Sequence, residues 1–141
     1  MFQLVYVSSG VKPFSSDELL QLLVTSRQNN EKLGISGMLL YKGGDFMQAL
    51  EGDEAAVRSM SARIATDPRH GEITTVLQGP CEAREFPDWS MGFQDLSTVD
   101  PRLVPGYTTF LDSPLRASTF AANPATCRRL LLLFKNNPGG N

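Results

Sequence analysis

A tyrosine and a primary amide stand at positions expected to face the core of the protein. In the stretch DFMQALE, read as a strand, Gln48 shares a face with Phe46 and Leu50. A buried amide left unpaired costs about 1–3 kcal/mol, so Gln48 needs a partner. Tyr6 lies on the core-facing side of another strand. Its hydroxyl could bond the amide, or both groups could bond a polar, planar guest.

Two asparagines near the end of a predicted helix form a second candidate group. Asn29 and Asn30 belong to the stretch SRQNN, residues 26–30. Asparagine is a poor interior helix residue and is often a cap near a helix end. An amide also has a donor beside an acceptor, so it can bond a ring edge in a bidentate way.

Basic residues cluster around the ends of both predicted helices: Arg27, Lys32, Arg63, Arg69 and His70. Arginine suits phosphate because its fork is bidentate. Basic side chains also favour helix C-termini through the helix dipole, and this explains the cluster when it is taken alone. Likewise, a single buried Tyr or Gln is more simply a structural residue bonded to backbone.

No established catalytic or metal motif accompanies these residues. The chain lacks GxSxG, Walker A and GxGxxG patterns, and His70 has no Ser or Cys neighbour that marks it as a base. The two cysteines, Cys81 and Cys127, have no CxxC spacing, so we expect no metal. A small phosphate-ester or acyl-phosphate enzyme using Arg27 and Asn30 stays open as an alternative.

Composition and charge favour an ordinary globular protein. Of the 141 residues, 41% are hydrophobic and 20% charged, which is enough for one domain with a core. A net charge of −2 argues against broad binding to nucleic acid or to an anionic membrane surface. No signal peptide pattern is present, and the longest apolar run, residues 130–134, is far short of the roughly 20 residues that span a bilayer. We expect a cytoplasmic protein.

Start and stop signals divide the chain into seven elements. Ser15 with Glu18 forms a capping box before the first helix, which should end near Lys32 with Gly34 in the left-handed conformation. Asp53 should cap the second helix, with Val57, Met60 and Ile64 as its apolar stripe and Asp67-Pro68 as its end. Strands are predicted over 2–8, 35–41, 45–51, 72–81 and 88–94.

The order β-α-β-β-α-β-β predicts an α+β fold, a ferredoxin-like sandwich with both helices on one face of the sheet. We expect this domain to cover residues 1–95. Residues 96–141 form an extension that ends in a helix over 124–135, and its apolar run should be covered on both sides.

Five motifs occur together and in order: YVS (6–8), SRQNNEKLGISGMLLY (26–41), GGDFMQALEG (43–52), DPRH (67–70) and WSMGF (89–93). In this combination the chain resembles a BLUF domain, the sensor of blue light using FAD, over residues 1 to about 95. The remainder resembles the helices that follow the sensor core in short BLUF proteins.

The resemblance implies non-covalent FAD with its ring between the two helices. Leu22 and Ile64 would flank the ring, and Asn30 would bond its pyrimidine edge beside Asn29. Arg63 and Arg69 would lie near the ring edge or the ribityl-phosphate chain. The full set of candidate cofactor-binding residues is Tyr6, Leu22, Arg27, Asn29, Asn30, Gln48, Ile64, Arg63, Arg69 and His70.

The resemblance also implies how the light response works. Gln48 would bridge the Tyr6 hydroxyl and the flavin. After excitation by blue light, Tyr6 would donate an electron and a proton, and Gln48 would end in a new hydrogen-bonding arrangement, by rotation or tautomerisation, that shifts the absorption to the red. Trp89 and Met91 would exchange places near Gln48 to relay the change. Ser8, on the Tyr6 face, would tune the network.

About 46 residues follow residue 95, too few for a cyclase or phosphodiesterase domain. We therefore expect no enzyme activity, a homo-oligomer, and a separate downstream protein partner. The 124–135 helix is a candidate contact surface or a cover for the sheet. A competing hypothesis is a cofactor-free interaction module in which the same residues are ordinary core.

Overall fold

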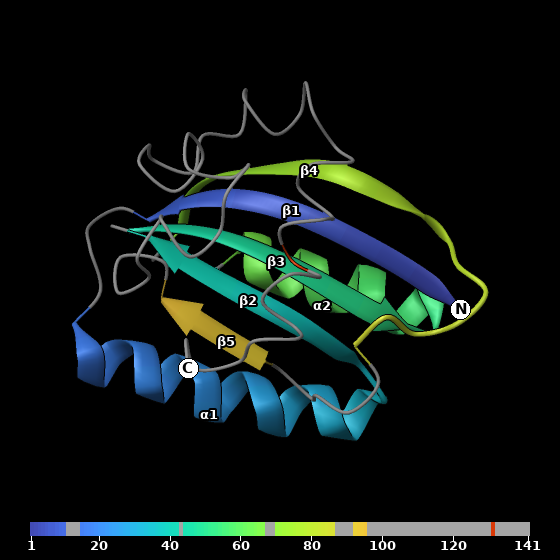
Figure 1. Ribbon diagram of the computed structural model, residues 1–141, viewed down its shortest axis with the longest axis horizontal. Helices are drawn as coiled ribbons and strands as arrows, with labels where there is room; N and C mark the ends of the chain where they lie inside the picture. Colours follow the sequence, from blue (N-terminus) through green and yellow to red (C-terminus); the bar gives the residue numbers. More distant parts are fainter. Residues whose placement is uncertain (11–14, 43, 67–69, 87–91, 96–130, 132–141) are drawn as a thin grey trace, which may run out of the picture.

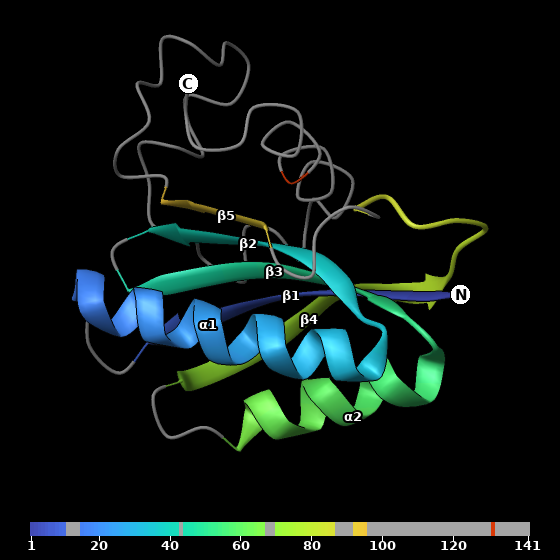
Figure 2. The same ribbon diagram turned by 90° about the horizontal axis from the view of Figure 1, so that it is seen from below.

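A five-stranded sheet carries two helices on one of its faces (Figure 1; Figure 2). The computed structural model describes residues 1–10, 15–42, 44–66, 70–86, 92–95 and 131. The elements are β1 (Phe2–Gly10), α1 (Ser16–Leu33), β2 (Ser36–Lys42), β3 (Asp45–Gly52), α2 (Glu54–Ala65), β4 (His70–Pro80) and β5 (Gly92–Asp95).

The strands lie in the order β4-β1-β3-β2-β5. All pairs are antiparallel except β2 with β5, which is parallel. The first four strands with α1 and α2 form the ferredoxin-like arrangement, so the predicted fold class is confirmed. β5 extends the sheet beside β2. It is described over Gly92–Asp95, and the expected start at residue 88 lies outside the described part of the chain.

Helix α1 begins and ends at the predicted signals. The Ser15 side chain accepts a hydrogen bond from the Glu18 N–H at 3.1 Å, and the Glu18 carboxylate accepts one from the Ser15 N–H at 3.0 Å. At the other end Gly34 has φ 66°, the left-handed conformation that terminates a helix at low cost in glycine. The capping box and the glycine stop are both confirmed.

The apolar face of α1 is narrower than its sequence indicates. The sequence predicts a broad apolar face from Leu19, Leu20, Leu22, Leu23 and Val24. Of these, only Leu19 and Leu23 are buried and Leu22 is half-buried. Leu20 and Val24 are 60% and 42% exposed. Successive residues turn by 100°, so a helix on one sheet face buries only part of a continuous apolar run.

Helix α2 keeps its predicted stripe but not its predicted cap bond. Val57 and Met60 are buried and Ile64 is partly buried against the same core. Asp53 occupies the N-cap position, yet its side chain makes no capping hydrogen bond, which corrects the expectation. The helix ends at Ala65, slightly before Asp67-Pro68.

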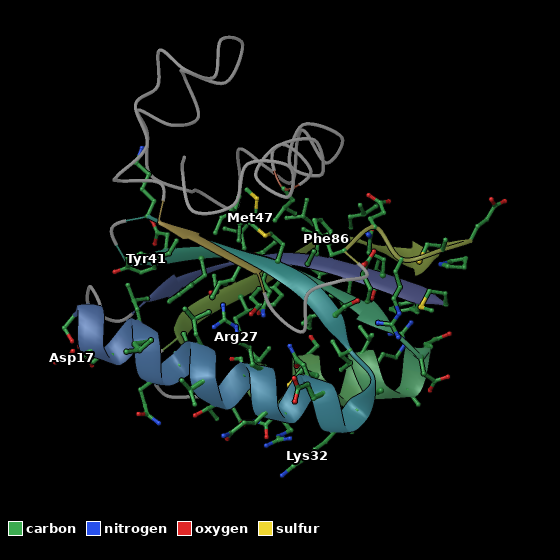
Figure 3. The ribbon with its side chains drawn as sticks, turned by 60° about the horizontal axis from the view of Figure 1, so that its bottom comes forward. Asp17, Arg27, Lys32, Tyr41, Met47 and Phe86 are labelled. Carbon is green, nitrogen blue, oxygen red and sulfur yellow. The ribbon has the colours of Figure 1, made fainter. Side chains whose placement is uncertain are left out.

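Both faces of the central strands are buried. Phe2, Leu4 and Phe46 belong to the core under the helices, whereas Val5 and Met47 are buried on the opposite face. Figure 3 shows Met47 on the side of the sheet away from α1. Phe86 and Leu131 are each 1% exposed. Leu131 is helical, in agreement with the predicted last helix, and the rest of that helix lies outside the described residues.

Candidate functional site

Tyr6 and Gln48 lie directly opposite each other on the two central strands. β1 and β3 pair with Tyr6 against Gln48, and their side chains point to the helix face. The Tyr6 hydroxyl donates a hydrogen bond to Gln48 Oε1. Both side chains are buried, at 2% and 5% exposure. The amide placed between Phe46 and Leu50 in the sequence therefore has the tyrosine as a partner.

A cavity of about 190 Å³ lies against Gln48, between α1 and α2. Nine side chains line it: Leu22, Thr25, Ser26, Asn29, Asn30, Gln48, Met60, Arg63 and Ile64. Ligand pockets usually measure roughly 300–1,000 Å³, so this cavity suits part of a large ligand, such as a ring system. The remainder of a dinucleotide would lie outside it.

The cavity wall combines apolar flanks with amides. Leu22 on α1 and Ile64 on α2 are half-buried at the wall. Gln48 and the asparagine pair supply donor and acceptor groups, and none of the described lining residues is acidic. A planar heterocycle with polar edges fits such a wall, since its faces meet apolar side chains and its edges meet amides. These residues fit the isoalloxazine ring of a flavin.

The end of α1 fixes the position of Asn30. This residue is 1% exposed, although it lies in the last turns of a surface helix. Its carbonyl oxygen accepts the Ile35 N–H at 2.8 Å, part of the closure made by Gly34 in its left-handed conformation. The Asn30 carbonyl is therefore bonded at the closed helix end, and the residue lines the cavity from there.

The structure brings together six of the ten candidate cofactor residues at the cavity: Leu22, Asn29, Asn30, Gln48, Arg63 and Ile64. Tyr6 joins them through its bond to Gln48. Arg27 is exposed and is not among the residues lining the cavity, so it does not form a paired phosphate site with Asn30 there. The residue pair on which the phosphate-enzyme alternative depended is thus not assembled at this cavity.

The remaining candidates lie elsewhere. Ser8 is buried on the Tyr6 face and pairs with Phe46 across β1 and β3. His70 is the first residue of β4 and pairs with Gly10, so this strand begins two residues before the expected residue 72. Arg69, Trp89 and Met91 lie outside the described residues.

The candidate set missed three lining residues, Thr25, Ser26 and Met60. Helical spacing could have indicated all three. Thr25 and Ser26 precede Asn29 and Asn30 by one turn on α1, and Met60 precedes Ile64 by one turn on α2. Within the described ranges, no group of three or more His, Cys, Asp or Glu could hold a metal ion. No helix in those ranges is long and apolar enough to cross a membrane.

Comparison with known proteins identifies the family. The model of the BLUF family, sensors of blue light using FAD, matches residues 1–92. Photoactivated adenylate cyclase subunit beta of Euglena gracilis is 37% identical over 89 residues, which is 62% of this chain and 10% of that protein. The chain thus spans about a tenth of the length of such curated relatives.

Solved structures agree with this match along most of the chain. The dark-state structure of BlrB, a BLUF protein, has a TM-score of 0.72 and 31% identity, covering 92% of this chain and 95% of that one. A bacterial light-regulated adenylyl cyclase has a TM-score of 0.74 and 25% identity, covering 97% of this chain and 39% of that one. The chain belongs to the BLUF family, the sensors of blue light using FAD.

Proposed function

We propose that this chain is a blue-light receptor whose photoactive pair is Tyr6 and Gln48. The observation that carries the proposal is the buried hydrogen bond from the Tyr6 hydroxyl to Gln48 Oε1, at the wall of the cavity between α1 and α2. A phenol bonded to an amide that also faces a ring-sized cavity can respond to events in that cavity. A Gln48 that served only to fill the core would not need a cavity beside it.

Bound FAD supplies absorption of blue light and, when excited, an electron acceptor. Tyr6 is the electron donor in this proposal, and its phenolic proton leaves along the existing hydrogen bond to Gln48 Oε1. Return of the electron and proton to Tyr6 leaves its covalent structure unchanged, so no substrate is turned over. The lasting change is the arrangement of the Gln48 amide.

The Gln48 amide can adopt two arrangements because its oxygen and nitrogen differ in hydrogen-bonding character. Its oxygen accepts from Tyr6 in the structure, which leaves the NH₂ group as a donor. Rotation or tautomerisation of the amide would exchange these roles and present a different group to the cavity. Such a change in hydrogen bonding to the ring would shift its absorption to the red.

The cavity residues would hold the ring and orient it. Leu22 and Ile64 would pack on its faces, and Asn30 with Asn29 would bond its polar edge. Arg63, exposed at the cavity, would meet the ring edge or the anionic chain of the cofactor.

Other family-based assignments stay proposals. Arg27, Arg69 and His70 would contact the outer part of the cofactor, Ser8 would tune the Tyr6–Gln48 network, and Trp89 with Met91 would relay its change.

We further propose that residues 1–95 form the sensor and residues 96–141 an extension that takes part in output. The sensor itself catalyses no reaction in this proposal. The matched cyclases of Euglena and bacteria suggest that a photosensor of this kind passes its signal to an effector. Here the signal would pass by protein–protein contact to a separate partner, from a homo-oligomer of this chain.

The test is an absorption spectrum of the purified protein in the dark, under blue light and after return to the dark. We expect a flavin spectrum with a small, reversible red shift. Gln48→Leu and Tyr6→Phe should keep the flavin and lose the shift. Tyr41→Phe is a matched control, because Tyr41 is also buried on the helix face but packs on Phe46 at the hairpin end.

Two results would oppose the proposal. A Gln48→Leu protein with an intact shift would remove Gln48 from the mechanism. A protein that takes up no FAD on refolding would instead favour the cofactor-free interaction module.

A further inference from the structure

A carboxylate is buried on the sheet face opposite the cavity. Glu51 lies on β3 and is 0% exposed. It accepts hydrogen bonds from Gln3 Nε2 at 2.8 Å, from the Glu85 N–H at 2.8 Å and from the Phe86 N–H at 2.7 Å. A buried carboxylate is tolerated only when donors such as these bond it, because each missing hydrogen bond to a buried charge is costly. Glu51 therefore fixes the backbone of residues 85 and 86 to β3.

Arg84 ties the same segment to neighbouring backbone. Its guanidinium donates to the Ser36 Oγ at 2.8 Å, to the Glu51 carbonyl oxygen at 3.1 Å and to the Gly34 carbonyl oxygen at 2.5 Å. These acceptors lie at the start of β2, at the end of β3 and at the turn after α1. A planar fork with five donors can join three such points, and a lysine ammonium cannot reach them in the same geometry.

The tied segment connects the two edges of the sheet. β4 and β5 are the edge strands, so the chain between Pro80 and Gly92 has to pass from one edge to the other. We call its described part, residues 81–86, the crossover. Glu51 and Arg84 hold the crossover against the end of β3 and the start of β2, two strands that lie between the edge strands (Figure 1).

The bond from Gln3 to Glu51 and the bond from Tyr6 to Gln48 span the same pair of strands. In the β1–β3 register Tyr6 faces Gln48 and Gln3 faces Glu51, three residues along, which is about 10 Å. The two bonds lie on opposite faces of the sheet, one under the helices and one toward the crossover. Any shift of β1 against β3 at the first bond therefore also changes the geometry of the second.

We propose that Glu51 and Arg84 are positioning residues that carry the rearrangement at Gln48 through the sheet to the crossover. This inference rests on the proposed function, because it requires light to change the Tyr6–Gln48 bond. When that bond changes, the β1–β3 pair adjusts, and the hydrogen bonds from Glu85 and Phe86 to the Glu51 carboxylate weaken. The contacts between the crossover and the ends of β2 and β3 then change, on the segment that leads to β5.

Amide hydrogen exchange of the FAD-loaded full chain tests this coupling. In the wild type, the Glu85 and Phe86 amides should exchange about tenfold or more faster under blue light than in the dark. Loss of a hydrogen bond to a charged group changes the exchange rate by about this factor. Glu51→Leu removes both acceptor oxygens, so the two amides should exchange fast in the dark, and light should add no further change. Its flavin red shift should remain.

Controls and a second variant keep the test decisive. Glu54→Leu is the matched control, since Glu54 is an exposed carboxylate paired with Arg58, and it should keep the light-dependent exchange. If Glu51→Leu does not fold, Arg84→Lys decides the question and should also lose the light-dependent change.

Failure of the inference can be told from failure of the proposed function. A normal red shift without any light-dependent exchange at the two amides would overturn the inference alone. A light-dependent change that persists in Glu51→Leu would overturn it as well. A wild-type protein without a red shift would overturn the proposed function, and this inference with it.

Discussion

Removing the Tyr6 hydroxyl tests whether it and Gln48 act as a pair. In Tyr6→Phe the Gln48 Oε1 loses a donor at a site where both side chains are buried. Loss of one buried hydrogen bond costs about 0.5–1.5 kcal/mol, and about 1–3 kcal/mol where the remaining polar group finds no replacement. Gln48→Leu removes the other partner. If the two groups interact, the double variant should be destabilised by less than the sum of the single variants, by about 0.5–3 kcal/mol.

The assay is urea unfolding of the four proteins in the dark with FAD in fixed excess. Each free energy of unfolding is corrected for the separately measured dissociation constant, because a ligand that binds only the folded state raises apparent stability. The control cycle combines Gln48→Leu with Phe2→Leu. Phe2 is buried on the same face of β1 but lies four residues, about 13 Å, from Tyr6. In this control cycle, the losses of unfolding free energy in the two single variants should add up to the loss in the double variant.

Additivity of Tyr6→Phe and Gln48→Leu within about 0.3–0.5 kcal/mol would refute the reasoning. The hydroxyl and the amide would then be independent core groups, and the photoactive pair would lose its structural basis.

Three further changes should follow from the geometry. Gly37→Ala should destabilise the protein by about 3 kcal/mol or more in urea unfolding, because a Cβ there would overlap the backbone carbonyl oxygen of Ala49 on β3. Gly34→Ala should cost about 1–2 kcal/mol in the same assay, since its Cβ would meet open space and only the left-handed φ of 66° is unfavourable. Equal losses of unfolding free energy in Gly37→Ala and Gly34→Ala would contradict this difference between a backbone overlap and an unfavourable φ. Asn30→Ala should weaken FAD affinity about tenfold in a fluorescence titration, and an unchanged affinity would remove Asn30 from the ring site.

The sequence by itself determined the local elements and the fold class. Ser15, Glu18 and Gly34 mark the ends of α1 through hydrogen bonds within a few residues, so their effect can be read without tertiary information. The alternation of β1 and β3 also placed Tyr6 and Gln48 on core-facing sides. Asp53 was placed correctly at the N-cap, but its missing cap bond depends on a side-chain orientation that sequence does not specify.

Tertiary structure decided which of these residues meet. The register of β1 against β3 puts Tyr6 opposite Gln48, and a shift of one residue would have moved one of them to the other face. The packing of α1 and α2 selected Met60 for the cavity and left Arg27 outside it. In the sequence, nothing distinguishes Glu51 from other polar residues near the end of a strand. Its role became visible only where the crossover from β4, more than thirty residues away in the chain, brings two backbone N–H groups to its carboxylate, because such non-local contacts leave no periodic signal in the sequence.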